Sequence, residues 1–338
     1  MKAGPKGAVT VVPLAFDRWP ASRARRRERI IADYLITPRG LGAGGSFKLR
    51  PFQREIVRGA FAPGVRTALV SIPRANGKTM LAAALALAEL FVGPPSAEVL
   101  VVASDQRQAN ITLRYARRMV ELNPVLAERV QVYADRLYLP ENDATLLPLP
   151  AERGALHGHD PSLQIVDELH VVTEDVWEAV TSVAGKRPES LTLAISTPAS
   201  SPDSVMWRLV EHGRRADDPA FFFKEFAAPE GCAVTDRKAW RIGNPAMACR
   251  GPFLSEDGVE AARKTIREPV FRQLRLGQWV TGVESWLPFG AWEACALDGR
   301  TVRVRMPAWR MALPMPSKPR RSKPGMPERC ATRRNRTV

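Results

Sequence analysis

The fold of this chain is decided by the stretch Ser71-Ile72-Pro73-Arg74-Ala75-Asn76-Gly77-Lys78-Thr79. It lies between an apolar, strand-like run at residues 67–72 and a helix-like run, rich in alanine and leucine, at residues 80–91. A strand, a tight loop and a helix in this order turn backbone N–H groups and a helix N-terminus toward an anionic phosphate. Within the loop, Lys78 can reach the β- and γ-phosphates of a nucleotide, and the Thr79 hydroxyl can ligate Mg²⁺. The stretch therefore predicts a phosphate-binding loop.

A second motif follows where the apolar run at residues 163–166 ends in Asp167 and Glu168. In a nucleotide-hydrolysing site, Asp167 would hold the Mg²⁺ shell and Glu168 would orient and polarise the attacking water. Each motif is weak alone, because the common loop pattern G-x-x-x-x-G-K-[ST] has a glycine where this chain has Ile72, and because acidic residues often only solvate a strand end. The two motifs together, in this order, predict an ATPase.

Apolar runs at residues 67–72, 98–103, 163–167 and 191–195 alternate with helical segments. This alternation predicts an α/β fold with a mainly parallel sheet flanked by helices. Ligands of such sheets bind at the carboxyl ends of the strands, so residues at several strand ends should converge there. Ser196 and Thr197 directly follow their strand and would lie beside the γ-phosphate, where they could report hydrolysis to a moving part. An ordinary Ser-Thr-Pro turn is the alternative.

Gln53 precedes the phosphate loop, follows Pro51 and Phe52, and introduces a short helix expected at residues 54–61. A side-chain amide donates and accepts hydrogen bonds at once, which suits the edge of an adenine base. We therefore expect Gln53 to read the base. An exposed glutamine on a surface helix is the alternative.

Two groups of histidines are further candidates. His157 and His159 stand in one short loop, but no third ligand of suitable spacing accompanies them, so a metal pair is only a minor alternative. His170 completes the pattern Asp-Glu-Leu-His and could link the hydrolytic site to a neighbouring strand through a hydrogen bond. A half-buried histidine with satisfied hydrogen bonds is an equal alternative.

The composition argues against several broad classes of protein. The sequence contains no stretch of about 18 apolar residues without a charged residue or a proline, so no membrane-spanning helix is predicted. The four cysteines are far apart and form no C-x-x-C pair, which argues against a zinc site and a disulfide framework. No small-residue cleavage site follows the short apolar stretch at residues 8–16, so a secretory signal is not expected. We therefore expect a cytoplasmic protein.

The net charge of +15 is concentrated at the two ends of the chain. Residues 1–29 carry eight lysines and arginines against Asp17 and Glu28, and residues 300–338 carry twelve against Glu328. The body between them is nearly neutral. Basic ends of this kind touch phosphate backbones or simply stay in solution, so composition alone predicts no DNA-binding face on the body.

These pieces, in this order, resemble the large terminase subunit of tailed double-stranded-DNA phages, the motor that pumps the genome into a procapsid. The resemblance spans most of residues 15–296. It rests on YLITPRG and LRPFQREIV, PRANGKT, AEVLVVASDQRQA, LHGHDPSLQIVDELH and LTLAISTPAS. Further on, GNPAM and FRQLRLGQWVTGVESWLPFGAWEAC look like the connector between the ATPase and a nuclease. The family has an arginine in its phosphate loop where this chain has Arg74, so the missing first glycine is usual for it.

The resemblance implies a P-loop NTPase fold of the additional-strand type and a set of site residues. The nucleotide-binding residues would be Gln53, Arg74, Asn76, Gly77, Lys78 and Thr79. Mg²⁺, bound with ATP, would be held by Thr79 and Asp167. The catalytic residues would be Glu168, Lys78 and Arg74, with Arg74 stabilising charge on the γ-phosphate. Ser196 and Thr197 would couple hydrolysis to DNA movement. The implied partners are double-stranded DNA, the portal protein and the small terminase subunit, with the chain forming a homo-oligomeric ring on the procapsid.

Four parts of the chain are expected: a basic N-terminal segment and linker at 1–46, the ATPase domain at 47–229, a connector at 230–298 and a basic, proline-rich tail at 299–338. Complete large subunits continue into a nuclease domain of RNase H type, whose clustered carboxylates hold two divalent ions. After Asp298 the only acid is Glu328. Nuclease activity is therefore predicted to be absent, and the tail to come from a shifted reading frame or a degraded prophage copy.

Two alternative functions stay open. A helicase of the D-E-x-H class needs a second ATPase-like lobe that supplies arginine fingers, and residues 200–300 offer Gly213-Arg214-Arg215 without a second strand–helix series. An inactive prophage remnant would bind nucleotide or the small subunit without productive turnover. DNA-dependent turnover would separate the remnant from the motor.

Overall fold

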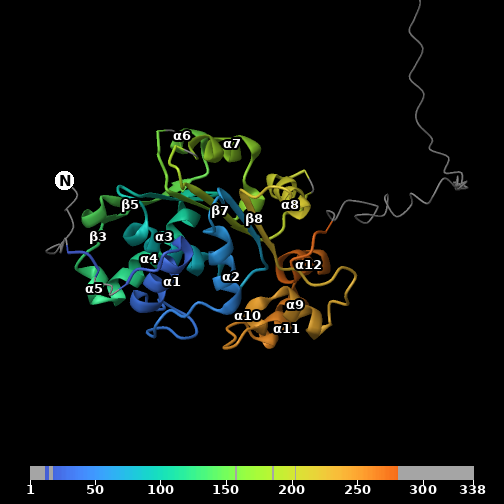
Figure 1. Ribbon diagram of the computed structural model, residues 1–338. Coiled ribbons are helices and arrows are strands. Elements are labelled where there is room, and N and C mark those ends of the chain that lie inside the picture. The colour runs from blue at the N-terminus through green and yellow to red at the C-terminus, as the bar shows by residue number, and fades with distance from the viewer. Residues whose placement is uncertain (1–11, 15–17, 157, 185, 202, 281–338) are drawn as a thin grey trace, which may run out of the picture. The chain divides into compact units, whose positions relative to one another are not determined.

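The computed structural model describes residues 12–14, 18–156, 158–184, 186–201 and 203–280 of the 338-residue chain (Figure 1). These residues belong to one compact unit, Met1–Ala291. The tail expected at 299–338 lies outside the described residues, so the predictions about its origin and about nuclease activity stay predictions. No described helix combines the length and the apolar character that crossing a membrane requires.

One sheet of eight strands runs through the described residues in the order β3-β4-β5-β2-β6-β7-β1-β8 (Figure 1). Its strands are β1 Thr67–Ser71, β2 Glu98–Ala103, β3 Gln131–Val132, β4 Leu137–Leu139, β5 Ala144–Pro150, β6 Leu163–Asp167, β7 Leu191–Ser196 and β8 Phe221–Glu225. From β5 to β8 all neighbours are parallel, whereas β3 and β4 add an antiparallel edge. The predicted mainly parallel sheet is confirmed. Strand β7 lies between β6 and β1 and is the additional strand of the expected fold type.

Four of these strands, β1, β2, β6 and β7, match the apolar runs in the sequence. The other four were not predicted, because they are short or only partly buried. Strand β5 also contains Pro148 and Pro150, residues that argue against a central strand when only the sequence is read.

Helices cover both faces of the sheet, and alternate residues of each strand point to opposite sides. Ala68 and Val70 of β1 join a core cluster with α1 to α4, and Leu69 joins a second cluster with α7 and α8 (Figure 1). This alternation follows from the two-residue period of a strand. The helices of this part of the chain are α1 Arg23–Tyr34, α2 Pro51–Ala60, α3 Lys78–Val92, α4 Gln106–Leu122, α5 Pro124–Ala127, α6 Arg153–Leu156, α7 Glu174–Val183 and α8 Val205–Arg215, with short 3₁₀ turns η1 Pro140–Asn142 and η2 Leu169–Val171.

The basic N-terminal segment contributes a helix to the core. Helix α1 packs on α3 through Ile30 and Ile31, both fully buried. On the same helix, Arg27 is only 2% exposed and donates to Glu89 of α3, with its guanidinium carbon 4.2 Å from the centre of the Phe61 ring. The basic ends were expected to touch phosphate backbones or to stay in solution, and Arg27 does neither, because its charge is paired with Glu89 inside the protein.

A group of short helices follows the sheet and has a core of its own. These helices are α9 Arg237–Gly243, α10 Pro245–Ala248, α11 Glu256–Thr265 and α12 Glu268–Leu276, and we call residues 237–276 the helical segment. Its core is built around Trp240, Val259 and Phe271. It lies within the connector expected at 230–298, and it is attached to the phosphate loop, because the backbone N–H of Arg74 donates to the carbonyl of Leu274 at 2.8 Å.

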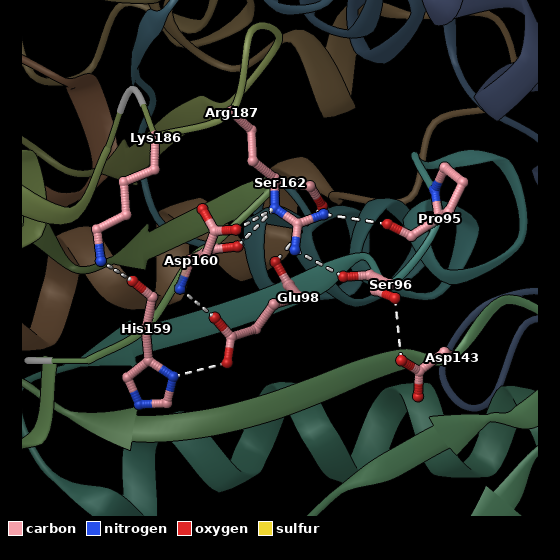
Figure 2. Close-up of polar contacts among 9 residues, drawn as sticks. All are labelled: Pro95, Ser96, Glu98, Asp143, His159, Asp160, Ser162, Lys186 and Arg187. Carbon is pink, nitrogen blue, oxygen red and sulfur yellow. Dashed lines mark hydrogen bonds and ion pairs between the residues drawn. The ribbon is translucent and has the colours of Figure 1, made fainter.

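A polar network joins the amino ends of β2, β6 and β7 (Figure 2), whereas the phosphate loop follows the carboxyl end of β1. Arg187, between α7 and β7, donates to the carbonyls of Ser96 and Asp160, each at 2.8 Å. Glu98 begins β2, and its two oxygens each lie 2.7 Å from a nitrogen, the backbone N–H of Asp160 and Nδ1 of His159. His159 is thus held by Glu98, while His157 lies outside the described residues. No group of three or more potential ligands that could hold a metal occurs among the residues the structure describes.

Candidate nucleotide-binding site

The phosphate loop connects β1 to α3 through two residues with positive φ. Gly77 has φ 78° and caps the N-terminus of α3, and Ala75 has φ 69°. Glycine adopts this conformation freely, whereas for alanine it is strained by about 1 kcal/mol or more. Ile72 does not have a positive φ, and its side chain is buried in the core. The pattern's first glycine is therefore not needed here, because position 72, directly after β1, has no positive φ.

Lys78 begins α3 and turns its ammonium group back over the loop. Its Nζ donates to the carbonyls of Ile72 at 3.1 Å and Pro73 at 3.3 Å. Burial lowers the pKa of Lys78 to about 8, although the nearby carboxylates of Glu168 and Asp167 oppose that shift. A buried cation held against carbonyls at the mouth of a loop is ready to exchange those partners for phosphate oxygens.

The two predicted metal ligands meet between α3 and β6. The Thr79 hydroxyl donates to Oδ2 of Asp167 at 3.3 Å. Burial, followed by the charge of Glu168, raises the pKa of Asp167 to about 6, with Lys78 and Thr79 acting in the opposite direction. The other oxygen, Oδ1 of Asp167, is buried without a hydrogen-bond partner in the described part of the chain. An orphaned carboxylate oxygen beside a hydroxyl fits a hard divalent cation, which prefers oxygen ligands.

Glu168 and His170 connect this site to β7. Glu168 follows β6 with φ 59°, a strained conformation of the kind found at functional sites. Burial alone would raise the pKa of Glu168, but the neighbouring imidazole of His170 and the positive charge of Lys78 hold it below its usual value. Nδ1 of His170 lies 3.1 Å from Oε2 of Glu168 and 3.1 Å from Oγ of Ser196. The link predicted for His170 is therefore present in the structure, and its Nδ1 also lies 3.4 Å from the Thr197 hydroxyl.

A cavity of about 690 Å³ opens over the loop. This volume is within the range of cofactor pockets. The predicted residues that line it are Gln53, Arg74, Gly77, Lys78, Thr79 and Glu168. Asp167 joins them through Thr79, whereas Ser196 and Thr197 are buried behind Glu168 and reach the site through His170.

Gln53 lies in the first turn of α2 rather than before a helix, and it is buried, not exposed. Its Oε1 accepts from the backbone N–H of Arg50 at 2.9 Å, and its Nε2 is the side-chain atom that approaches Gly77. The side chain therefore links the start of α2 to the loop and keeps its amide donors on the cavity side.

Asn76 differs from the other predicted nucleotide-binding residues. Its side chain does not line the cavity but donates to Oδ1 of Asn244 at 2.8 Å. The structure also adds cavity residues that sequence reasoning missed, namely Arg39, Lys48, Arg50, Tyr115 and Phe253. Arg39, Lys48 and Arg50 precede α2, Tyr115 lies on α4 and Phe253 in the helical segment. Arg39 and Arg50 stand within YLITPRG and LRPFQREIV, which indicated the family but no role at the cavity.

The topology and the site together define a class of protein. A mainly parallel sheet with an additional strand between β1 and β6, and a loop lysine facing two strand-end carboxylates, is the fold of a P-loop nucleoside triphosphatase.

The comparisons with known proteins narrow this class. Residues 56–215 match the family model described as "Terminase large subunit, ATPase domain". Residues 56–215 are therefore a homologue of the terminase large subunit ATPase domain. The chain is 32% identical over 289 residues to the terminase large subunit of Enterobacteria phage HK97, a match that covers 80% of this chain and 56% of that protein.

Two solved structures agree with this assignment. The crystal structure of the HK97 bacteriophage large terminase superposes with a TM-score of 0.69 at 31% identity, covering 81% of this chain and 59% of the other. The large terminase ATPase domain of Thermus phage P74-26 superposes with a TM-score of 0.53 at 20% identity, covering 69% and 95%, and so supports the fold. This chain spans a little over half the length of its HK97 relative.

Proposed function

We propose that this chain is an Mg²⁺-dependent ATPase that drives movement of double-stranded DNA into a procapsid. The observation that carries the proposal is the meeting of Lys78, Thr79 and Glu168 at one cavity, with Asp167 hydrogen-bonded to Thr79 beside it. Their order along the chain and their positions at the ends of β1 and β6 are those of a nucleotide-hydrolysing site.

Each side chain has a distinct part in this proposal. Lys78 gives up its contacts with the loop carbonyls to bind the β- and γ-phosphates, and Arg74, exposed at the cavity, stabilises charge on the γ-phosphate. Thr79 and the orphaned oxygen of Asp167 would hold Mg²⁺, which neutralises phosphate charge. Glu168, kept ionised and oriented by His170, accepts a hydrogen bond from the attacking water and polarises it.

Coupling would run from Glu168 through His170 to Ser196 and Thr197. These hydroxyls lie at the end of β7, next to both motif strands, so a change at the γ-phosphate reaches them through one histidine. We place the chain in a homo-oligomeric ring on the procapsid, in the host cytoplasm, with the portal protein and the small terminase subunit as partners. The likeness to the HK97 large subunit supports this assembly.

The test is ATP turnover by the purified chain, with and without Mg²⁺ and duplex DNA. Glu168→Gln should abolish turnover but retain ATP binding, because the amide keeps the shape and loses the charge. Glu211→Gln, an exposed acid on α8, is the matched control and should behave as wild type. Binding without turnover in the wild-type chain, alone and with DNA, would instead support the inactive remnant.

A further inference from the structure

The side chain of Asn76 leaves the nucleotide cavity and enters a buried amide pair with Asn244. Asn76 Nδ2 donates to Asn244 Oδ1 at 2.8 Å, and Asn76 Oδ1 accepts from the backbone N–H of Ala246 at 3.0 Å. Asn76 is 2% exposed and Asn244 is 0% exposed. The two ends of one amide therefore join the loop to Asn244, 168 positions away, and to Ala246, 170 positions away.

Asn244 is itself held in place by the helical segment. Its Nδ2 donates to the carbonyls of Trp240 at 3.0 Å and Arg275 at 2.8 Å. The preceding residue, Gly243, lets the end of α9 lie close to the backbone at Ala228, because a Cβ at position 243 would lie 2.8 Å from the backbone nitrogen of Ala228. Every polar atom of the Asn244 side chain is thus used, and a fully satisfied buried network fixes a single geometry.

The same pair reaches the phosphate loop directly. Besides Asn244, Asn76 Nδ2 lies within hydrogen-bond distance of the carbonyls of Pro73 at 3.2 Å and Arg74 at 3.3 Å. Between these residues and Asn76 stands Ala75, whose positive φ is strained. A strained loop conformation persists only where surrounding contacts determine it. Here those contacts come from Asn244 and from the hydrogen bond between Arg74 N–H and the Leu274 carbonyl.

We propose that Asn244 is a positioning residue of the nucleotide site. Through Asn76 it keeps the phosphate loop in the shape that receives phosphates before any nucleotide arrives. The inference rests on the proposed ATPase function and deepens it, because it makes the helical segment part of the site. Asn244 does not line the cavity, so its effect is on the loop and not on the reacting atoms.

Losing this contact should weaken binding more than chemistry. Without Asn244 the loop must be ordered when nucleotide binds, and that ordering lowers affinity. Asp167 ends β6 and Glu168 directly follows it, so both keep their places. We therefore expect Asn244→Ala to raise the KM for ATP on the order of tenfold, as loss of one or two buried hydrogen bonds would, and to leave kcat within about twofold.

The experiment uses the full chain and three variants. Asn244→Ala and Asn76→Ala remove the two sides of the pair. Asn142→Ala is the control, since its amide also joins separate segments, donating to the carbonyls of Leu90 and Pro94, away from the cavity. Steady-state ATP kinetics give KM and kcat, and hydrogen exchange of residues 73–77 in the nucleotide-free protein reports loop order.

The expected result is a raised KM and faster exchange of the loop in both pair variants, with neither change in Asn142→Ala. The double variant should be no worse than the poorer single one, because both remove one interaction. An unchanged KM and unchanged loop exchange in Asn244→Ala would overturn the inference.

If Asn244→Ala does not fold, Asn76→Ala replaces it as the test, and loop exchange as slow as in the wild type in that variant overturns the inference. Failure of the wild-type chain to turn over ATP would defeat the proposed function instead, and the exchange measurement would still report whether Asn244 orders the loop.

Discussion

The Thr79 hydroxyl lies 3.3 Å from Oδ2 of Asp167, although the two residues are 88 positions apart. The contact exists because β1 and β6 are parallel and separated only by β7, which brings their carboxyl ends to one edge of the sheet. A hydroxyl at the start of a helix and a carboxylate at a strand end can share one cation only in such an arrangement.

This relationship gives the first prediction, on metal dependence. Asp167→Asn should raise the Mg²⁺ concentration for half-maximal turnover by at least about tenfold, because it replaces a charged ligand with a neutral one. Thr79→Val should act in the same direction and Thr79→Ser should not, since serine keeps the hydroxyl. Mg²⁺ titrations at fixed ATP measure this, and equal behaviour of the valine and serine variants would contradict a ligand role for Thr79.

The second prediction concerns Arg74, which is exposed at the cavity while its backbone is fixed by Leu274. Arg74→Ala should lower kcat by on the order of 10³-fold, because an arginine facing the γ-phosphate acts mainly in the transition state. Equilibrium binding of ATP should change much less. Single-turnover kinetics combined with ATP binding separate the two effects, and an unaltered kcat would indicate that this charge comes from another subunit.

The third prediction concerns choice of base. Gln53→Glu keeps the oxygen that accepts from the Arg50 backbone, so helix α2 should stay intact. It removes the amide donors that adenine recognition needs. The ratio of kcat/KM for ATP to that for GTP should fall by about tenfold. A ratio that stays at the wild-type value would show that Gln53 only caps the helix.

The fourth prediction concerns stability and the buried pair of Arg27 and Glu89. Glu89→Ala should lower the free energy of unfolding by about 3–5 kcal/mol, because it leaves a buried guanidinium without its partner. The double variant Arg27→Met with Glu89→Leu should recover most of that loss. Urea denaturation measures both. The control is Arg118→Ala, which removes a surface ion pair with Glu121 and should change the free energy of unfolding by less than about 1 kcal/mol.

Much of the site could be predicted from local sequence. The run before Ser71 and the run after Lys78 have the residues of a buried strand and an alanine-rich helix, and the loop between them has the lysine and hydroxyl that phosphates and metal require. Strand β6 is apolar up to Asp167, so its carboxylate must emerge at the strand end. These patterns are local, and local patterns survive in the sequence without knowledge of the fold.

Other parts of the site depend on contacts between distant segments. Phe253 and Tyr115 line the cavity, yet none of the motifs recognised in the sequence includes them. The family resemblance implied that Asn76 binds nucleotide, and only the packed helical segment shows that its side chain is hydrogen-bonded to Asn244.

The sequence by itself determined the class of site in this protein: which strand ends carry charge, which loop receives phosphate and which fold could bring them together. The tertiary structure alone decided where the side chains point and which distant helix holds the loop. The physical reason is the range of the interactions. Strand and helix preferences act over a few residues, whereas the direction of a buried amide such as Asn76 is set by the one partner that satisfies its hydrogen bonds, and that partner lies 168 positions away.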